Sequence, residues 1–190
     1  MATYFTSDIH FGDERIMKLC GRPFQTVKEM DEYIIKRWNE KVEPTDTVWV
    51  LGDVVSPEHF DMDLLNRLNG RIHLLAGNHD YPVHGRIMDE TKIEPYVESL
   101  FYFEGGSLVM FHYPIMDWVG RDDGVIHLYG HVHNKHIAGM EEYFADKLAF
   151  NVCMDVNDFE PKTLKELVVA AGKLELYREK YGYYVKEFDY

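Results

Sequence analysis

The sequence has few cysteines and no excess of basic residues, and these shortages exclude several classes of protein. Two cysteines in 190 residues, Cys20 and Cys153, cannot form the disulfide framework of a small secreted protein. The formal net charge is −13, whereas proteins that grip nucleic acid through its phosphates usually carry a basic surface. We therefore expect no stable nucleic-acid binding, although a local pocket could still bind a phosphate group.

The sequence also lacks a long apolar run and a secretion signal. No apolar run approaches the roughly 20 residues needed to cross a bilayer. The first ten residues, MATYFTSDIH, contain neither the basic region nor the apolar region of a signal peptide. We therefore expect a soluble protein of the reducing cytoplasm with no membrane contact. No pattern in the sequence indicates an oligomeric state.

Hydrophobic residues make up 46% of the chain, which is enough for a substantial core. Short apolar runs, each bounded by polar or glycine-containing loops, are typical of buried strands. Such runs lie near residues 3–7, 47–51, 72–76, 107–111, 125–129 and 148–152. No linker separates them, so we predict a single domain over residues 1–190.

Capping patterns predict three helices between or after these strands. The helices begin after Thr26, after Ser56 with Pro57 in the first turn, and after Thr163. The last segment, LELYREKYGYYVKEFDY, alternates enough to predict a final β-hairpin. Strands and helices alternate in the first half and strands dominate the second, which predicts an α/β layered fold with one or two mixed sheets covered by helices.

Five of the predicted strands are followed directly by side chains that can bind a metal ion. In α/β sheets, ligands bind at the edge where the strands end. The polar residues at these ends are, in chain order, Asp8, His10, Asp53, Asn78, His79, Asp80, His112, His131 and His133. We therefore predict that they meet in one site.

The types of ligand indicate a pair of transition-metal ions. Carboxylate, imidazole and amide groups suit Mn²⁺, Fe²⁺ or Fe³⁺, Zn²⁺, Co²⁺ or Ni²⁺, and the thiolates of a structural zinc site are missing. The candidate ligands are Asp8, His10, Asp53, Asn78, His112, His131 and His133. These seven groups are too many for one tetrahedral ion and suit two ions that share Asp53 as a bridge.

Spacing and charge add to this interpretation. In Asp8-x-His10, residues two apart on an extended segment point to the same side and can reach one ion, and His131-x-His133 is expected to have the same geometry. Two divalent ions, two aspartates and a hydroxide leave a net charge near +1, which attracts a phosphate ester. Two adjacent metal ions can also activate a water molecule for attack on such an ester.

The order of the motifs D-x-H, G-D, G-N-H-D, H and G-H-x-H resembles that of the calcineurin-like metallophosphoesterases. The motifs span residues 8 to 133, and the segments DIHFGDERIMKLCGRPF and MDVNDFEPKTLKEL are similar to a small bacterial or phage-type subgroup. The resemblance implies a four-layer fold, in which two mixed β-sheets pack together and helices cover them outside.

The resemblance also implies roles for individual residues. It assigns one ion to Asp8, His10, Asp53 and His133, and the other to Asp53, Asn78, His112 and His131. It makes His79 the general acid that protonates the leaving oxygen, with Asp80 orienting it. Related small members often carry a histidine where this chain has Asp13, which weakens inference of the substrate from the subgroup.

Residues outside the motifs have more than one interpretation. Arg22 and Arg121 could reach a substrate phosphate or be solvated at the surface. Tyr113 and Trp118 could line the pocket or pack in the core. We expect His127 to be a core residue of its strand. His59, His73, His84 and His136 are expected in loops or at the surface, the last two near the pocket, and Trp38 and Trp49 in the core.

The implied function is hydrolysis of a phosphodiester by a hydroxide that two metal ions activate, with His79 as general acid. The substrate would be a small phosphate ester such as a nucleotide, and a nucleotide phosphomonoesterase is the alternative within this class. After Asp53 the chain reads VVSPEHF rather than the Arg-Gly of related protein phosphatases, and it leaves little room for the capping domain of related nucleases. A non-catalytic scaffold on the same fold is the alternative from another class.

Overall fold

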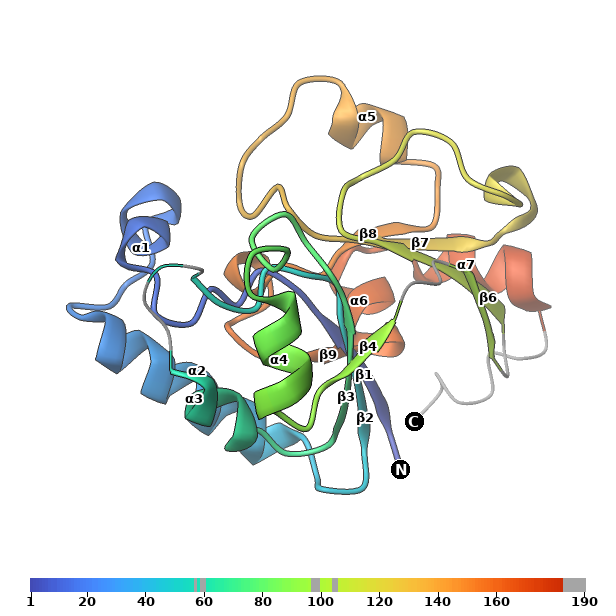
Figure 1. Ribbon diagram of the computed structural model, residues 1–190. Coiled ribbons are helices and arrows are strands. Elements are labelled where there is room, and N and C mark those ends of the chain that lie inside the picture. The colour runs from blue at the N-terminus through green and yellow to red at the C-terminus, as the bar shows by residue number, and fades with distance from the viewer. Residues whose placement is uncertain (57, 59–60, 97–99, 104–105, 183–190) are drawn as a thin grey trace.

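The computed structural model describes residues 1–56, 58, 61–96, 100–103 and 106–182. Two β-sheets lie at its centre, with helices on both sides (Figure 1). The first sheet has the strand order β4-β3-β2-β1-β9, and the second has the order β5-β6-β7-β8.

Both sheets are mixed. In the first sheet, β9 (Lys162–Thr163) runs antiparallel to β1 (Thr3–Thr6), while the other neighbours are parallel: β2 (Thr47–Val50), β3 (Arg71–Leu75) and β4 (Glu94–Tyr96). In the second sheet, β5 (Leu100–Phe103) is antiparallel to its neighbour, while the others run parallel: β6 (Gly106–Phe111), β7 (Ile126–Tyr129) and β8 (Ala149–Asn151). All six strands predicted from the sequence are confirmed.

Three helices, α2 to α4, lie beside the first sheet, and a fourth, α1, lies further out on the side of the loops, where its buried residues join the same apolar cluster (Figure 1). They are α1 (Glu14–Cys20), α2 (Val27–Lys41), α3 (Met62–Asn66) and α4 (His84–Glu90). The longest, α2, buries Met30, Ile34 and Trp38 on one face because these residues recur at helical spacing. They pack against Val48 and Val50, which alternate along β2 with residues facing the second sheet.

A second apolar cluster lies between the two sheets. Leu51 and Leu75 from the first sheet side meet Met110 and Leu128 from the second. The helices α6 (Leu164–Ala170) and α7 (Leu174–Tyr181) pack against the same cluster. This shared core holds the two sheets together. It therefore fixes the position of the loops of one sheet relative to the loops of the other.

The outer face of the second sheet has a thinner cover. Trp118, from the loop after β6, and Phe144, from α5 (Met140–Phe144), pack against Val109 and Tyr129. Short 3₁₀ helices at Arg121–Asp123 and Met154–Val156 complete the connections. The structure therefore has four layers: helices, the first sheet, the second sheet, and a cover made of α5 and a loop. This arrangement confirms the prediction of two mixed sheets flanked by helices.

The predicted C-terminal hairpin is wrong over the described residues. Residues 174–181 form α7, because Leu174, Tyr177 and Tyr181 recur at helical spacing and pack against the inner core. The rings of Tyr177 and Tyr181 stack with centroids 4.7 Å apart. The rest of that prediction falls on residues 183–190, which lie outside the described residues.

Two of the three predicted helix starts are confirmed. The Thr26 and Thr163 side chains each accept a hydrogen bond in the first turn of α2 and α6. The start after Ser56 is wrong, because α3 begins at Met62 with Asp61 as its N-cap. The Ser56 amide instead donates to the Phe11 carbonyl, and Pro57 lies outside the described residues. None of the helices in the described chain is long and apolar enough to span a bilayer.

Candidate metal centre

The loops that follow β1, β2, β3, β6 and β7 meet at one edge of the two sheets. Backbone hydrogen bonds join them in pairs: the Asp8 amide donates to the Gly52 carbonyl (2.9 Å), and the Gly130 amide donates to the His112 carbonyl (2.8 Å). The carboxylate of Asp8 then accepts the His131 amide, at 2.9 Å for Oδ2, and so links the first sheet to the second. The predicted convergence of these loops is therefore present.

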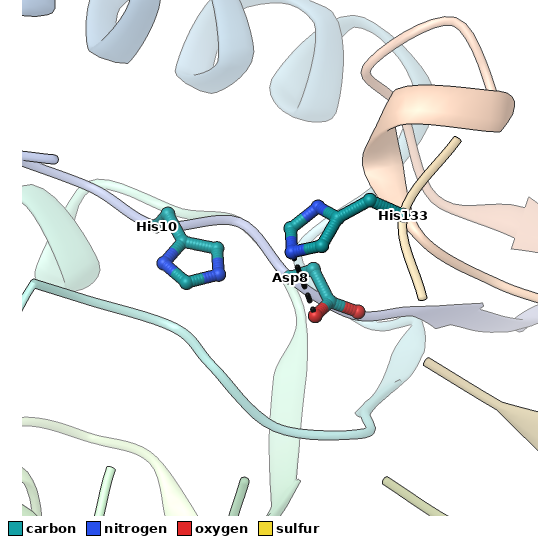
Figure 2. Close-up of side chains that lie close together, drawn as sticks. All are labelled: Asp8, His10 and His133. Carbon is teal, nitrogen blue, oxygen red and sulfur yellow. Dashed lines mark ion pairs between the residues drawn. The ribbon is translucent and has the colours of Figure 1, made fainter. Parts of the chain in front are cut away.

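The first ligand cluster contains Asp8, His10 and His133. One ligand atom from each residue lies within 4.8 Å of the others. His133 points its Nε2 toward Asp8 Oδ1 at 3.5 Å, with His10 beside them (Figure 2). All three side chains are buried, and the two imidazoles line the cavity described below.

The second ligand cluster contains Asp53, His112 and His131. The Leu51 carbonyl accepts a hydrogen bond from His112 Nδ1 (2.7 Å), which leaves Nε2 facing Asn78 Oδ1 at 3.0 Å and Asp53 Oδ2 at 3.4 Å. Both of these oxygens are acceptors, so a proton or a metal ion at His112 Nε2 is needed to bind them. Burial lowers the pKa of His112, but the contact with Asp53 outweighs it and raises that pKa.

Asp53 stands between the two clusters. Its Oδ2 lies 3.7 Å from His10 Nε2 in the first cluster and 3.4 Å from His112 Nε2 in the second. Its Oδ1 accepts the backbone amide of His79 at 2.8 Å, which fixes the orientation of the carboxylate. A single buried oxygen therefore faces imidazoles of both clusters.

The donors fit divalent metal ions. Both ring nitrogens of His10 are buried and have no hydrogen-bond partner among the described residues, although buried polar atoms are normally paired. The Asp13 carboxylate lies 3.6 Å from His10 Nδ1. Burial lowers the pKa of His10 and so favours a neutral imidazole with a lone pair free for a metal ion. Imidazole and carboxylate groups are the ligands that divalent transition metals prefer.

The backbone at the ligands is strained. Left-handed φ angles occur at five of the predicted ligands, namely Asp8, His10 and Asp53 (56° each), His131 (70°) and His133 (50°). Such conformations are uncommon outside glycine, cost on the order of 1 kcal/mol or more each, and cluster at functional sites. The prediction that Asp8, His10, His131 and His133 lie on extended segments is therefore wrong. Asp8 and His10 still converge, whereas His131 and His133 enter different clusters.

Two motif glycines are required by close approach to ligands. A Cβ atom on Gly77 would lie 2.3 Å from Asp53 Oδ1, and one on Gly130 would lie 2.5 Å from Asp8 Oδ2. Both distances are shorter than real contacts allow. The glycines in G-N-H-D and G-H-x-H therefore leave room for the carboxylates that the site needs.

The structure gives Asp80 a different role from the predicted one. Its carboxylate accepts the backbone amides of Asp53 (2.7 Å), Val54 (2.9 Å) and Gly77 (2.8 Å). In the described structure it makes no hydrogen bond to the His79 imidazole, so it ties the loops after β2 and β3 together instead of orienting His79. Burial raises the pKa of Asp80 to about 6. The half-buried His79 lines the cavity, with its ring centroid 5.0 Å from that of His10.

Arg22 and Asp155 support the first cluster, a role that the sequence did not reveal. The buried Arg22 guanidinium donates to both Asp155 oxygens, at 2.8 and 2.9 Å. It also donates to the carbonyls of Ile9 (2.8 Å) and Asp8 (2.7 Å), inside the strained loop. Arg22 is thus occupied and does not face the cavity, which excludes both interpretations given above. Asp155 lies 133 positions further along the chain, so spacing gave no signal for this pair.

Asp155 also sets the orientation of His133. Its Oδ2 lies 2.7 Å from His133 Nδ1, so the Nδ1 proton points to Asp155 and Nε2 points to Asp8. Burial by itself would lower the pKa of His133, but the hydrogen bond to Asp155 and the charge of Asp8 raise it to about 10. Metal binding through Nε2 would therefore release a proton, as metal sites with protonated ligands do.

We predict that Asp155→Asn weakens metal binding by about 10- to 100-fold, the effect usual for loss of a partner behind a metal ligand. The substitution removes the charge that orients His133 and leaves the Arg22 cation buried without its counter-charge. The measurement is the dissociation constant for Mn²⁺ by calorimetric titration. Unfolding temperature is followed in parallel, and an unchanged dissociation constant would contradict the role.

Most of the remaining candidates lie away from the cavity. His127 is buried in β7, as predicted, with Nδ1 3.1 Å from the Val109 carbonyl. His73 is buried in β3 against Trp49, contrary to the surface position expected of it.

Trp118 packs under α5, and Arg121 contacts Asp122 and Tyr143, away from the cavity. His84 begins α4 and His136 is an exposed partner of Glu141, and neither lines the cavity. Tyr113 is 38% exposed rather than packed in the core, and its hydroxyl donates to the predicted ligand Asn78 at 3.3 Å. His59 lies outside the described residues.

A cavity of about 650 Å³ opens above the two clusters. Ligand residues and His79 form its floor, and α1 and Lys135 form its walls. This volume falls in the range of pockets that hold small organic ligands.

The chain belongs to the calcineurin-like phosphoesterase superfamily, whose domain model matches residues 1–185. It is 30% identical over 176 residues to the uncharacterised protein MJ1445 of Methanocaldococcus jannaschii, covering 90% of this chain and 93% of that one. It is 27% identical over 164 residues to the gene 66 protein of Mycobacterium phage L5, covering 71% and 79%. The membership confirms the predicted family and supports phosphoesterase activity, and the family typically binds divalent metals.

A solved structure has the same fold. The protein of unknown function AQ665 from Aquifex aeolicus superposes with a TM-score of 0.69 and 23% identity, covering 88% of this chain and 98% of that one. The likeness covers most of the chain. It therefore supports the four-layer arrangement and leaves the activity to be argued from the site.

Proposed function

We propose that the protein is a phosphoesterase that depends on two metal ions and hydrolyses a small phosphodiester. The observation that supports it most is the position of Asp53 Oδ2, which faces His10 of one cluster and His112 of the other at 3.7 and 3.4 Å. One ion would be held by Asp8, His10, His133 and Asp53. The other would be held by Asn78, His112, His131 and Asp53. Two such ions, when bound, lower the pKa of a water molecule and neutralise charge on phosphate oxygens.

Protein side chains would supply the remaining chemistry. His79 stands on the floor of the cavity, with its backbone held by Asp53, and its imidazole can donate a proton to the leaving oxygen. Arg22 and Asp155 would keep Asp8 and His133 oriented. The cavity has room for a sizeable organic group beside the phosphate. The two free, buried cysteines suit a reducing cytoplasm.

Hydrolysis of two chromogenic esters tests the proposal. The protein is stripped with a chelator, dialysed, and assayed with bis-p-nitrophenyl phosphate and p-nitrophenyl phosphate before and after addition of Mn²⁺ or Ni²⁺. We expect no turnover without metal, recovery on metal addition, and faster hydrolysis of the diester. If elemental analysis finds two bound ions and neither ester is hydrolysed, the result favours the scaffold alternative.

A further inference from the structure

One wall of the cavity is basic although the chain is acidic. The sequence has 33 acidic and 20 basic residues. Outside the metal ligands and His79, the charged residues that line the cavity in the described chain are Arg15, Lys18, Lys135 and one acid, Asp13. Three cations therefore line the cavity beside the candidate metal centre, where they can interact with an anion.

Two of the cations lie on one face of α1. Arg15 and Lys18 are three residues apart, and Leu19 is four residues from Arg15, so their side chains project on the same side of the helix. Leu19 is 62% exposed and lines the cavity beside them. Lys135, in the loop after β7, lines the same cavity. The cavity thus offers cations and an apolar contact beyond the reach of the metal ligands.

The existing partners of these cations are weak competitors. Arg15 contacts Asp13 at 3.3 Å and Glu58 at 3.5 Å, and Lys18 contacts Glu14 at 2.7 Å. Glu58 and Glu14 are mostly exposed, and exposed ion pairs contribute little free energy. A phosphate group can therefore replace Glu58 and Glu14, while the buried Asp13 keeps its contact with Arg15. For Lys135, no ion pair is present among the described residues.

Asp13 has a separate role in this arrangement. It is the buried N-cap of α1, where it accepts the Arg15 backbone amide at 2.9 Å, and it contacts the Arg15 Nε at 3.3 Å. The carboxylate therefore fixes both the start of the helix and the direction of the guanidinium. This gives a physical reason for an aspartate at position 13.

We propose that the substrate carries a second phosphate besides the one hydrolysed, and that Lys135, Lys18 and Arg15 bind it. The inference rests on the proposed function. The substrate class is an organic phosphodiester with an additional phosphate, as in a nucleoside bisphosphate ester, whose apolar part contacts Leu19. A lone phosphate would occupy only a small part of a 650 Å³ cavity.

A matched pair of substrates tests this inference. Thymidine 5′-(p-nitrophenyl phosphate) and its 3′-phosphorylated analogue differ only in the second phosphate, and release of p-nitrophenolate reports cleavage of the same diester in both. We expect kcat/KM to be about tenfold or more higher for the 3′-phosphorylated ester, the effect of one charge-assisted hydrogen bond. Most of the difference should lie in KM, and it should shrink as salt increases.

Variants identify the residues responsible. Lys135→Gln should reduce the preference for the 3′-phosphorylated ester severalfold, and the double substitution with Lys18→Gln should bring it near one. The matched control is Lys36→Gln, which removes the same charge from an exposed position on α2 away from the cavity. Retention of the preference in Lys135→Gln with Lys18→Gln, or an equal loss in Lys36→Gln, would overturn the assignment.

Binding separates this inference from the proposed function. Thymidine 3′,5′-bisphosphate and thymidine 5′-monophosphate are titrated into the Mn²⁺-loaded protein by calorimetry. Tighter binding of the bisphosphate that is lost in Lys135→Gln would support the second phosphate site even without turnover, in which case only the phosphoesterase proposal fails. Turnover of both esters with no preference in rate or in binding would overturn the second phosphate site alone.

Discussion

Asp53→Asn is expected to remove nearly all phosphoesterase turnover and to lower metal affinity by more than about 100-fold. This loss should exceed that caused by removing a residue that only hydrogen-bonds to a metal ligand. The substitution keeps the size of the side chain but removes the negative charge that faces both clusters. Because the same oxygen would serve two ions, both should be affected together. The measurement is metal content by elemental analysis after dialysis, with turnover of bis-p-nitrophenyl phosphate.

A second buried aspartate provides the control for Asp53. Asp46 is buried outside the site, where it accepts the backbone amides of Ala2 and Glu43. Asp46→Asn should affect unfolding temperature and leave metal content unchanged. Retention of two bound ions by a folded Asp53→Asn protein would show that this residue does not bridge them.

His79→Ala is expected to reduce turnover by about 10²- to 10⁴-fold for a substrate with an alkoxide leaving group, the contribution usual for a general acid. Metal content should stay close to that of the wild type, because His79 belongs to neither three-residue cluster. Asp53→Asn should therefore lower metal occupancy much more than His79→Ala does, while both lose most turnover.

The leaving group distinguishes proton donation by His79 from other roles. p-Nitrophenolate leaves with little need for a proton, so His79→Ala should slow p-nitrophenyl esters less than a dinucleotide. His136→Ala, at an exposed histidine that does not line the cavity, is the matched control. An equal loss for both leaving groups would exclude the general-acid role, and an empty metal centre would reassign His79 as a ligand.

The sequence predicted the strands and their polar ends well, for a physical reason. Buried strands need continuous apolar runs, and ligands at the sheet edge must follow those runs directly, so Asp8, Asp53 and His112 were visible as interruptions of a pattern. Packing against the rest of the fold decided features that the local apolar pattern did not contain. The tail formed α7 because Tyr177 and Tyr181 pack against the inner core, which local alternation did not reveal.

Pairings between distant residues were the main part of the site that the sequence did not predict. Arg22 and Asp155 meet only after the two sheets have packed, and neither directly follows a predicted strand. Asp80 was assigned to the neighbouring His79, yet its carboxylate faces backbone amides from two loops. The left-handed φ angles at Asp8, His10 and Asp53 also set where the ligand side chains point, and a list of residue types does not encode them.

The left-handed backbone at Asp8, His10, Asp53, His131 and His133 implies a trade-off between thermal stability and function. Glycine would relax these positions but would remove the donors, so the chain retains conformations that favour unfolding. Ions that bind only the folded state would offset that cost by mass action. Metal supply in the cell would then govern how long the protein persists as well as how fast it works.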